Sequence, residues 1–162
     1  VGRTGKFLAG ENFGKKANIT TLAKGIAGGL PMGACLTGKK CSGVLTGGTH
    51  GSTFGGNPLA CAGGLAVVNK VADEKFLAEI NAKADYFKKK LLEIPEIEGV
   101  DGLGLMIGAR LKTKNAADIC RACSENGLLI LTAKTKLRFL PPLNITYEEI
   151  DEGFEILRRI LA

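Results

Sequence analysis

The sequence predicts a mixed α/β fold made of two structural units that join near residue 95. Residues 1–64 hold 17 of the 23 glycines, with short apolar runs between them, which is typical of short strands joined by tight turns. Residues 57–95 show apolar side chains at helical spacing, and the residues after Pro95 alternate between strand and helix patterns. The hydrophobic content of 45% is that of an ordinary globular chain.

Short strands are the main prediction for the glycine-rich segment. Ile19–Ala23 and Gly33–Leu36 are apolar runs bounded by glycine or polar residues, and both are predicted as strands. Lys39–Leu45 is predicted as a short helix. No long amphipathic pattern occurs here, so strands and turns dominate the prediction.

A helix of small residues is predicted to begin after Asn57. Asn57 is a suitable N-cap, and Pro58 suits the first helical turn. Small side chains follow, and a helix that carries them must pack closely against its neighbours. They are Ala60, Cys61, Ala62, Gly63, Gly64 and Ala66.

A second helix is predicted to begin at Asp73 and to end before Pro95. Its other face, which includes Lys88–Lys90, is expected to be solvated. Five apolar positions recur at helical spacing and form the expected core face: Phe76, Ile80, Ala84, Phe87 and Leu91.

The C-terminal part of the sequence shows a compact α+β pattern. Gly99–Leu111 is predicted as a strand or hairpin, and Asn115–Asn126 as a helix closed by Gly127. Leu128–Leu131 and Lys136–Leu140 are predicted strands. A final helix begins with a capping box, Thr146 to Glu149, and carries Ile150, Phe154, Leu157 and Leu161 on one face.

Charge is distributed unevenly along the chain. Residues 1–64 carry seven Lys or Arg and a single acid, Glu11, so this segment (7 − 1) accounts for the whole formal charge of +6. Such a segment favours an anion held by backbone and lysine, or an acidic partner surface outside this chain. Nucleic acid is disfavoured as a partner, because the chain has only nine aromatic residues and no Lys/Arg stripe interleaved with them.

Cellular location is indicated by the cysteines and by the absence of long apolar stretches. The five cysteines are odd in number and scattered, which suits reduced thiols better than a disulfide framework. No run approaches the roughly 20 apolar residues of a membrane helix, and no signal-peptide pattern opens the chain. A cytoplasmic protein with no membrane contact is therefore expected.

Three short motifs are assigned to structure rather than to chemistry. Gly33–Lys39 matches the first seven positions of a P-loop, but Lys40 stands where a serine or threonine must bind magnesium. Cys120 and Cys123 form a CxxC inside a predicted helix, without a second pair for zinc. The only histidine, His50, is expected in a turn or a pocket wall, so no metal site is predicted.

Lys24 is the strongest candidate for chemistry. A lysine amine becomes a nucleophile when it is desolvated or lies near another cation or a cofactor, and it then forms a Schiff base with an aldehyde. The glycines after Lys24 allow a bulky ring to approach. The loop Thr49–Pro58 offers the hydroxyls of Ser52 and Thr53 and several amides just before a helix, which makes it a candidate phosphate cradle. A carbonyl and a phosphate together describe pyridoxal 5′-phosphate (PLP).

Four ordered blocks of the sequence resemble the class III, PLP-dependent aminotransferases. The segment "GLLILTAKTKLRFLPPL" is most similar to the acetylornithine aminotransferases. This resemblance implies a fold-type-I PLP transferase, with residues 1–92 as the C-terminal part of the large domain and residues 93–162 as the small α+β domain. The blocks are "VGRTGKF" (1–7), "TLAKGIAGGLPMGA" (21–34), "THGSTFGGNPLACAG" (49–63) and "LRFLPPLNIT" (137–146).

The resemblance also assigns roles to matching residues. Lys24 would be the Schiff-base lysine and the base that moves the substrate proton. Thr53 would hold the cofactor phosphate across a homodimer interface, with Ser52 beside the substrate. Arg138 would bind a substrate carboxylate, because its planar guanidinium group matches a carboxylate better than a lysine ammonium group does. The alternatives are a surface turn for Lys24, a helix-entry role for Thr53 and a strand ion pair for Arg138.

The implied reaction transfers the amino group between N2-acetyl-L-ornithine and 2-oxoglutarate in arginine biosynthesis. Ornithine, succinylornithine and 4-aminobutyrate aminotransferases are the alternatives within the family. The family's other phosphate loop, its stacking aromatic ring and the aspartate that pairs with the pyridine nitrogen have no match in this sequence. The chain is therefore expected to be the C-terminal portion of such an enzyme, inactive without its N-terminal half, or else a non-catalytic remnant or interaction module.

Overall fold

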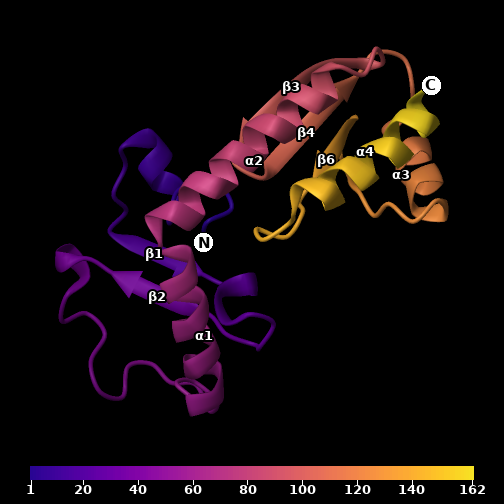
Figure 1. Cartoon of the computed structure of the whole chain (residues 1–162). Coiled ribbons are helices and arrows are strands. Elements are labelled where there is room, and N and C mark those ends of the chain that lie inside the picture. The colour runs from indigo at the N-terminus through magenta and orange to yellow at the C-terminus, as the bar shows by residue number, and fades with distance from the viewer. The chain divides into compact units, whose positions relative to one another are not determined.

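The computed structural model describes residues 1–162, and the chain forms two compact units (Figure 1). The first unit contains Val1–Gly2 and Lys6–Phe76, and the second contains Arg3–Gly5 and Leu77–Ala162. The mixed α/β class predicted from the sequence is confirmed. The two units divide between Phe76 and Leu77, inside a helix, whereas the domain boundary expected after residue 92 stays a prediction.

The first unit contains a two-stranded antiparallel sheet and one long helix. Strands β1 (Ile19–Leu22) and β2 (Ala34–Thr37) pair in register from Ile19 opposite Thr37 to Leu22 opposite Ala34. Both predicted strands are confirmed within a residue or two at their ends. Two 3₁₀ helices, η1 (Ala9–Phe13) and η2 (Lys24–Ala27), lie on either side of β1 in the sequence.

The helix predicted at Lys39–Leu45 is wrong beyond its first turn. The structure has only the 3₁₀ turn η3 (Lys39–Cys41). Ser42 is already extended, with a ψ of 131°, and Gly43 has a φ of 80°, which an α-helix does not accept.

Helix α1 (Pro58–Val71) begins as predicted. The Asn57 side chain accepts a hydrogen bond from the Ala60 amide at 2.9 Å, and Pro58 occupies the first helical position. A Cβ added at Gly63 would lie 2.9 Å from the Ala27 carbonyl oxygen, and one at Gly64 would lie 2.8 Å from the Met32 sulfur. The small residues therefore allow the close packing that the sequence required.

Helix α2 (Glu74–Leu92) is introduced by Asp73, whose Oδ1 accepts a hydrogen bond from the Lys75 amide at 2.9 Å. The five apolar positions predicted to form its core face are all buried. The expectation of a solvated lysine run is wrong at two of its three positions. Lys88 Nζ donates to the Gly102 carbonyl at 3.0 Å, and Lys90 Nζ lies 2.5 Å from Asp151 Oδ1, because neighbouring elements reach over this face.

A four-stranded antiparallel sheet dominates the second unit, with the strand order β3-β4-β6-β5. The predicted hairpin is confirmed as β3 (Ile97–Leu103) and β4 (Met106–Leu111), and β6 is Lys136–Phe139. Strand β5 is Leu131–Ala133, so the strand predicted at Leu128–Leu131 is displaced. The Leu128 amide donates to the Cys123 carbonyl at 2.8 Å, so Leu128 caps the C-terminal end of the preceding helix and does not pair in the sheet.

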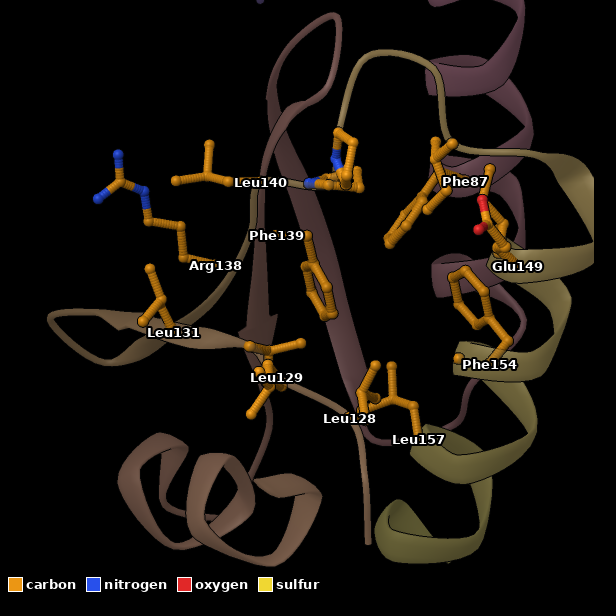
Figure 2. A pocket seen from close by; sticks show the side chains of 16 residues that line it. Phe87, Leu128, Leu129, Leu131, Arg138, Phe139, Leu140, Glu149, Phe154 and Leu157 are labelled. Carbon is orange, nitrogen blue, oxygen red and sulfur yellow. The ribbon is translucent and has the colours of Figure 1, made fainter. Parts of the chain in front are cut away.

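Helices α3 (Ala116–Glu125) and α4 (Tyr147–Leu161) complete the second unit. The capping box of Thr146 with Glu149 is as predicted, and the N-cap of α3 is Asn115, which accepts bonds from two amides of the helix. The four apolar positions predicted for α4 are buried, and Figure 2 shows Phe154 beside Phe87 and Phe139. None of the helices in either unit combines the length and apolar character that crossing a bilayer requires.

Candidate functional site

Lys24 lies at the start of η2 in the first unit. Its side chain is exposed, and its amine makes no hydrogen bond or ion pair with the protein. Two residues later the chain is buried, with Ile26 and Ala27 only 3% and 2% exposed. A free amine is thus attached to a turn whose other side is anchored in the core.

The backbone at Lys24 adopts a conformation that side chains disfavour. Its φ is 59°, in the left-handed region, which costs roughly 1–2 kcal/mol for a residue other than glycine. Lys134 has a similar φ of 57°, but it lies between the hairpin strands β5 and β6, where such values are common. No hairpin turn accounts for Lys24, and unusual φ values of this kind cluster at functional sites.

Helix α1 determines the position of η2. The Ala27 carbonyl oxygen lies where a Cβ at Gly63 would approach it to 2.9 Å, so the backbones of the two helices meet without an intervening side chain. The Gly28 amide donates to the Gly25 carbonyl at 3.2 Å and closes the turn. The position of Lys24 therefore depends on a glycine of α1, some forty residues later in the chain, because this glycine lets η2 pack directly against the helix.

The second candidate element is the loop that precedes α1. The Gly55 amide donates to the Ser52 carbonyl at 3.2 Å, and the Asn57 side chain donates to the Phe54 carbonyl at 3.0 Å. Ser52 and Thr53 are exposed, and the hydroxyl of Thr53 makes no hydrogen bond within the chain. A donor hydroxyl is thus presented on a folded loop.

The helix end itself is less available than the sequence suggested. Asn57 already accepts the Ala60 amide, and the amides of Gly55 and Asn57 bond to carbonyls within the loop. The predicted phosphate cradle therefore reduces to the Thr53 hydroxyl and the remaining loop amides. A Cβ at Gly51 or Gly56 would meet no atom within 4 Å, so the loop has open space on both sides of Thr53.

Arg138 lies on β6 in the second unit. It is half-buried, and its guanidinium group has no hydrogen bond or ion pair. Figure 2 shows this group pointing away from the aromatic cluster, on the same side of β6 as Leu131 and Leu140. The alternative of a strand ion pair is therefore wrong for Arg138 in this structure, and its five donors are free for an external anion.

A mostly apolar cavity of about 290 Å³ lies at β6, and its lining includes Arg138. Figure 2 shows Phe139, Phe154 and Leu157 around it. Its one carboxylate, Glu149, is already bound by the Thr146 amide at 2.8 Å within the capping box. The other charged side chain of the lining is Arg138, which has no partner in the chain, and the sequence did not indicate this cavity because its walls come from four separate elements.

The P-loop-like segment, the CxxC pair and the only histidine all lie in ordinary secondary structure or loops. Gly33–Lys39 contains strand β2, not a phosphate-binding loop. Cys120 and Cys123 lie within α3, and burial raises the pKa of the Cys123 thiol to about 11, which disfavours the reactive thiolate. His50 is exposed in the loop before Ser52, and no group of three potential metal ligands occurs.

Arg3 is a residue of the second unit that sequence reasoning missed. Its Nη1 atom donates to the carbonyl oxygens of Leu105 at 3.1 Å and Pro141 at 2.5 Å. Pro141 follows β6, so Arg3 holds the chain just beyond Arg138. Only its place in the block "VGRTGKF" was a signal, because both acceptors are more than a hundred residues away in the sequence.

Each unit, taken by itself, offers groups of the kind that bind PLP or an amino-acid substrate. Lys24 supplies a free amine, Thr53 a free hydroxyl and Arg138 a free guanidinium group. Open space next to Lys24, where a Cβ at Gly25 or Gly29 would meet no atom within 4 Å, leaves room for a planar ring. Lys24 and Thr53 belong to one unit, with no hydrogen bond between their side chains, and Arg138 belongs to the other.

Comparison with known proteins gives one consistent result. The family model for class-III aminotransferases matches residues 1–161. Acetylornithine aminotransferases from Haemophilus ducreyi and Aquifex aeolicus are 45% and 46% identical to the chain, which they match over 100% and 99% of its length. The chain covers 41% and 42% of those two proteins. It therefore spans about two fifths of the length of these relatives.

Solved structures agree. The N-acetylornithine aminotransferase from Stenotrophomonas maltophilia matches 98% of the chain with a TM-score of 0.86 and 34% identity, over 43% of its own length. The ornithine aminotransferase from Toxoplasma gondii matches 99% of the chain with a TM-score of 0.86 and 31% identity, over 40% of its own length. The structure accordingly has the fold of the C-terminal part of a fold-type-I transferase.

Proposed function

The chain belongs to the class-III aminotransferase family, and we propose that it supplies the lysine-bearing part of a PLP-dependent aminotransferase. The proposed reaction moves an amino group between N2-acetyl-L-ornithine and 2-oxoglutarate, because relatives that are 45% and 46% identical to the chain are named acetylornithine aminotransferases. Ornithine is the alternative amino donor, since ornithine aminotransferases share the fold at a similar TM-score.

The observation that carries this proposal is the state of Lys24. Its amine is exposed and without a partner, while the adjoining turn is anchored by buried residues and the backbone is strained. Lys24 would hold the cofactor through its amine nitrogen and, once released by the substrate, would carry a proton from the substrate Cα. PLP, when bound, supplies the electron sink that makes this proton acidic.

Thr53 and Arg138 would orient the two ends of the reactants. The Thr53 hydroxyl would donate a hydrogen bond to the cofactor phosphate, with Ser52 next to it facing the substrate. The guanidinium of Arg138 would bind a substrate carboxylate with two parallel hydrogen bonds. Because Thr53 and Lys24 form no hydrogen bond within one chain, we propose that the Thr53 of one copy serves the Lys24 of a second copy in a cytoplasmic homodimer.

The cofactor site is tested by trapping. PLP is added to the chain, the adduct is reduced with borohydride, and the labelled peptide is identified by mass spectrometry. We expect the label on Lys24, lost in Lys24→Gly and kept in Lys134→Gly. The two variants are matched, because both lysines have a φ near 60° that glycine accepts without strain. Equal labelling of both lysines, or labelling that survives Lys24→Gly, would contradict the proposal.

The substrate is tested by kinetics on the chain combined with the N-terminal part of a relative. We expect glutamate formation from N2-acetyl-L-ornithine and 2-oxoglutarate, with a higher kcat/KM than for ornithine. A higher kcat/KM for ornithine would show that ornithine is the amino donor, while the proposed type of reaction, amino transfer, would stand. A folded complex that binds PLP at Lys24 and shows no transfer would favour the non-catalytic module.

A further inference from the structure

The outer face of the second unit's sheet places an acid in line with Arg138. Asp101 on β3 lies opposite Gly108 on β4, and Gly108 lies opposite Arg138 on β6. Neighbouring strands are about 4.8 Å apart, so Asp101 and Arg138 are separated by roughly 10 Å of backbone. Gly108 places no side chain between them, and the two side chains together are long enough to meet.

Asp101 nevertheless pairs with two other cations. Arg110 Nη1 donates to its Oδ1 and Oδ2 at 2.7 and 2.6 Å, and Lys136 Nζ donates to its Oδ2 at 2.6 Å. Arg110 and Lys136 face each other across β4 and β6, one row along the sheet from Gly108. These hydrogen bonds hold the pKa of Asp101 at about 2, so the carboxylate stays ionised at neutral pH.

Two glycines make this arrangement possible. A Cβ at Gly99 would lie 2.0 Å from an Arg110 guanidinium nitrogen, so Arg110 reaches across β3 only because position 99 has no side chain. A Cβ at Gly108 would lie 3.7 Å from Lys136 Cδ, so the lysine stem runs beside the bare backbone of β4. The remaining carboxylate nearby, Glu98, lies 3.9 Å from Arg110 Nε.

We propose that Arg110 and Lys136 are positioning residues for substrate carboxylate binding, because they hold Asp101 and thereby keep the guanidinium group of Arg138 free. This inference rests on the proposed role of Arg138. If one cation is removed, Asp101 regains free acceptor positions and turns to the next cation in its row, Arg138. The new ion pair would then compete with the carboxylate of the substrate.

The test uses 2-oxoglutarate as the probe and NMR of the arginine side chains as the readout. Lys136→Met keeps most of the lysine stem and removes its charge. We expect this variant to bind 2-oxoglutarate about tenfold more weakly, as loss of one charge-assisted hydrogen bond implies, and to show a new Arg138 resonance protected by Asp101. Adding Asp101→Asn should restore the affinity to within about twofold of the unmodified chain.

A matched control separates the pairing from net charge. Lys136→Met with Glu98→Gln has the same charge as Lys136→Met with Asp101→Asn, but Glu98 is not in the row of Arg138. Only the Asp101 variant should restore binding. Equal rescue by both double variants, or an unchanged affinity in Lys136→Met, overturns the inference. If the unmodified chain shows no binding that depends on Arg138, the proposed role of Arg138 fails first, and the inference fails with it.

Discussion

At the scale of single residues, Lys24 and Lys134 have nearly the same φ angle but lie in different kinds of structure. Lys134 turns a hairpin, where a left-handed residue is ordinary. Lys24 begins the 3₁₀ helix η2 shortly after β1, and its amine is left without any partner. The difference lies in their surroundings, and for that reason the strained lysine of η2, and not the one in the hairpin, is the candidate for chemistry.

Asp101 makes the stability of the second unit depend on pH in the acidic range. Its pKa is lowered from 3.8 to about 2, first by the Arg110 hydrogen bond and then by that of Lys136. A lowered pKa contributes stability above the unfolded value near 3.8, and this contribution is lost as the pH falls towards 2. We expect Asp101→Asn to remove that part of the pH dependence between about pH 4 and 2.

Tyrosine fluorescence during urea unfolding measures this effect. Both tyrosines, Tyr86 and Tyr147, lie in the second unit, and the chain has no tryptophan, so the signal reports on that unit alone. Asp85→Asn removes an exposed carboxylate without a partner and controls for the loss of a charge. Identical pH profiles for the unmodified chain and Asp101→Asn would show that the ion pairs do not stabilise the fold.

At the scale of elements, helix α1 positions η2 closely because Gly63 has no side chain at the point where the two helices meet. Gly63 allows the Ala27 carbonyl to approach, and the buried end of η2 is thereby fixed relative to α1. The sequence predicted a closely packed helix from its small residues. It did not predict the neighbour, because η2 and α1 are far apart in the sequence and no local pattern links them.

Gly63→Ala should disturb Lys24 without touching it. The added Cβ would lie 2.9 Å from the Ala27 carbonyl oxygen, so η2 must shift. The gain in helix propensity, about 0.5–1 kcal/mol, favours α1 itself and does not relieve this clash. We expect labelling of Lys24 by PLP and borohydride to slow about tenfold while helical circular dichroism is kept. Gly47→Ala, where a Cβ meets no atom within 4 Å, is the control and should label at the normal rate.

At the scale of the whole molecule, the two units differ in how much apolar surface they bury. Only five of the 23 buried hydrophobic residues belong to residues 1–76, and the other 18 belong to residues 77–162. The first unit also exposes eight large apolar side chains, which a partner surface would be expected to cover. They are Phe13, Ile19, Leu36, Val44, Leu45, Phe54, Leu59 and Leu65.

We therefore expect the isolated chain to associate through its first unit. Sedimentation velocity should show oligomers or aggregates at micromolar concentration, and hydrogen exchange should be fast in residues 6–76 but slow in the core of the second unit. Phe54→Ser with Leu59→Ser should reduce association, whereas Leu129→Ser, equally exposed but in the second unit, should not. A monodisperse monomer of the unmodified chain would contradict this prediction.

The sequence by itself determined the features that depend on near neighbours. The caps at Asn57 and Thr146 and the buried faces of α2 and α4 involve residues at most four positions apart, so composition and spacing were enough to predict them. The motif blocks likewise identify Lys24, Thr53 and Arg138 as candidates from the sequence alone.

The tertiary structure alone decided the contacts between distant residues. Tyr86 and Asp151 are 65 positions apart, and Arg3 and Pro141 are 138 apart, yet each pair forms a hydrogen bond. The strain at Lys24 and the engagement of Asp101 by two cations are of the same kind, since they depend on which strands pair and which helices pack. No local pattern specifies such pairings, because they are determined by the burial and hydrogen bonding of the whole unit at once.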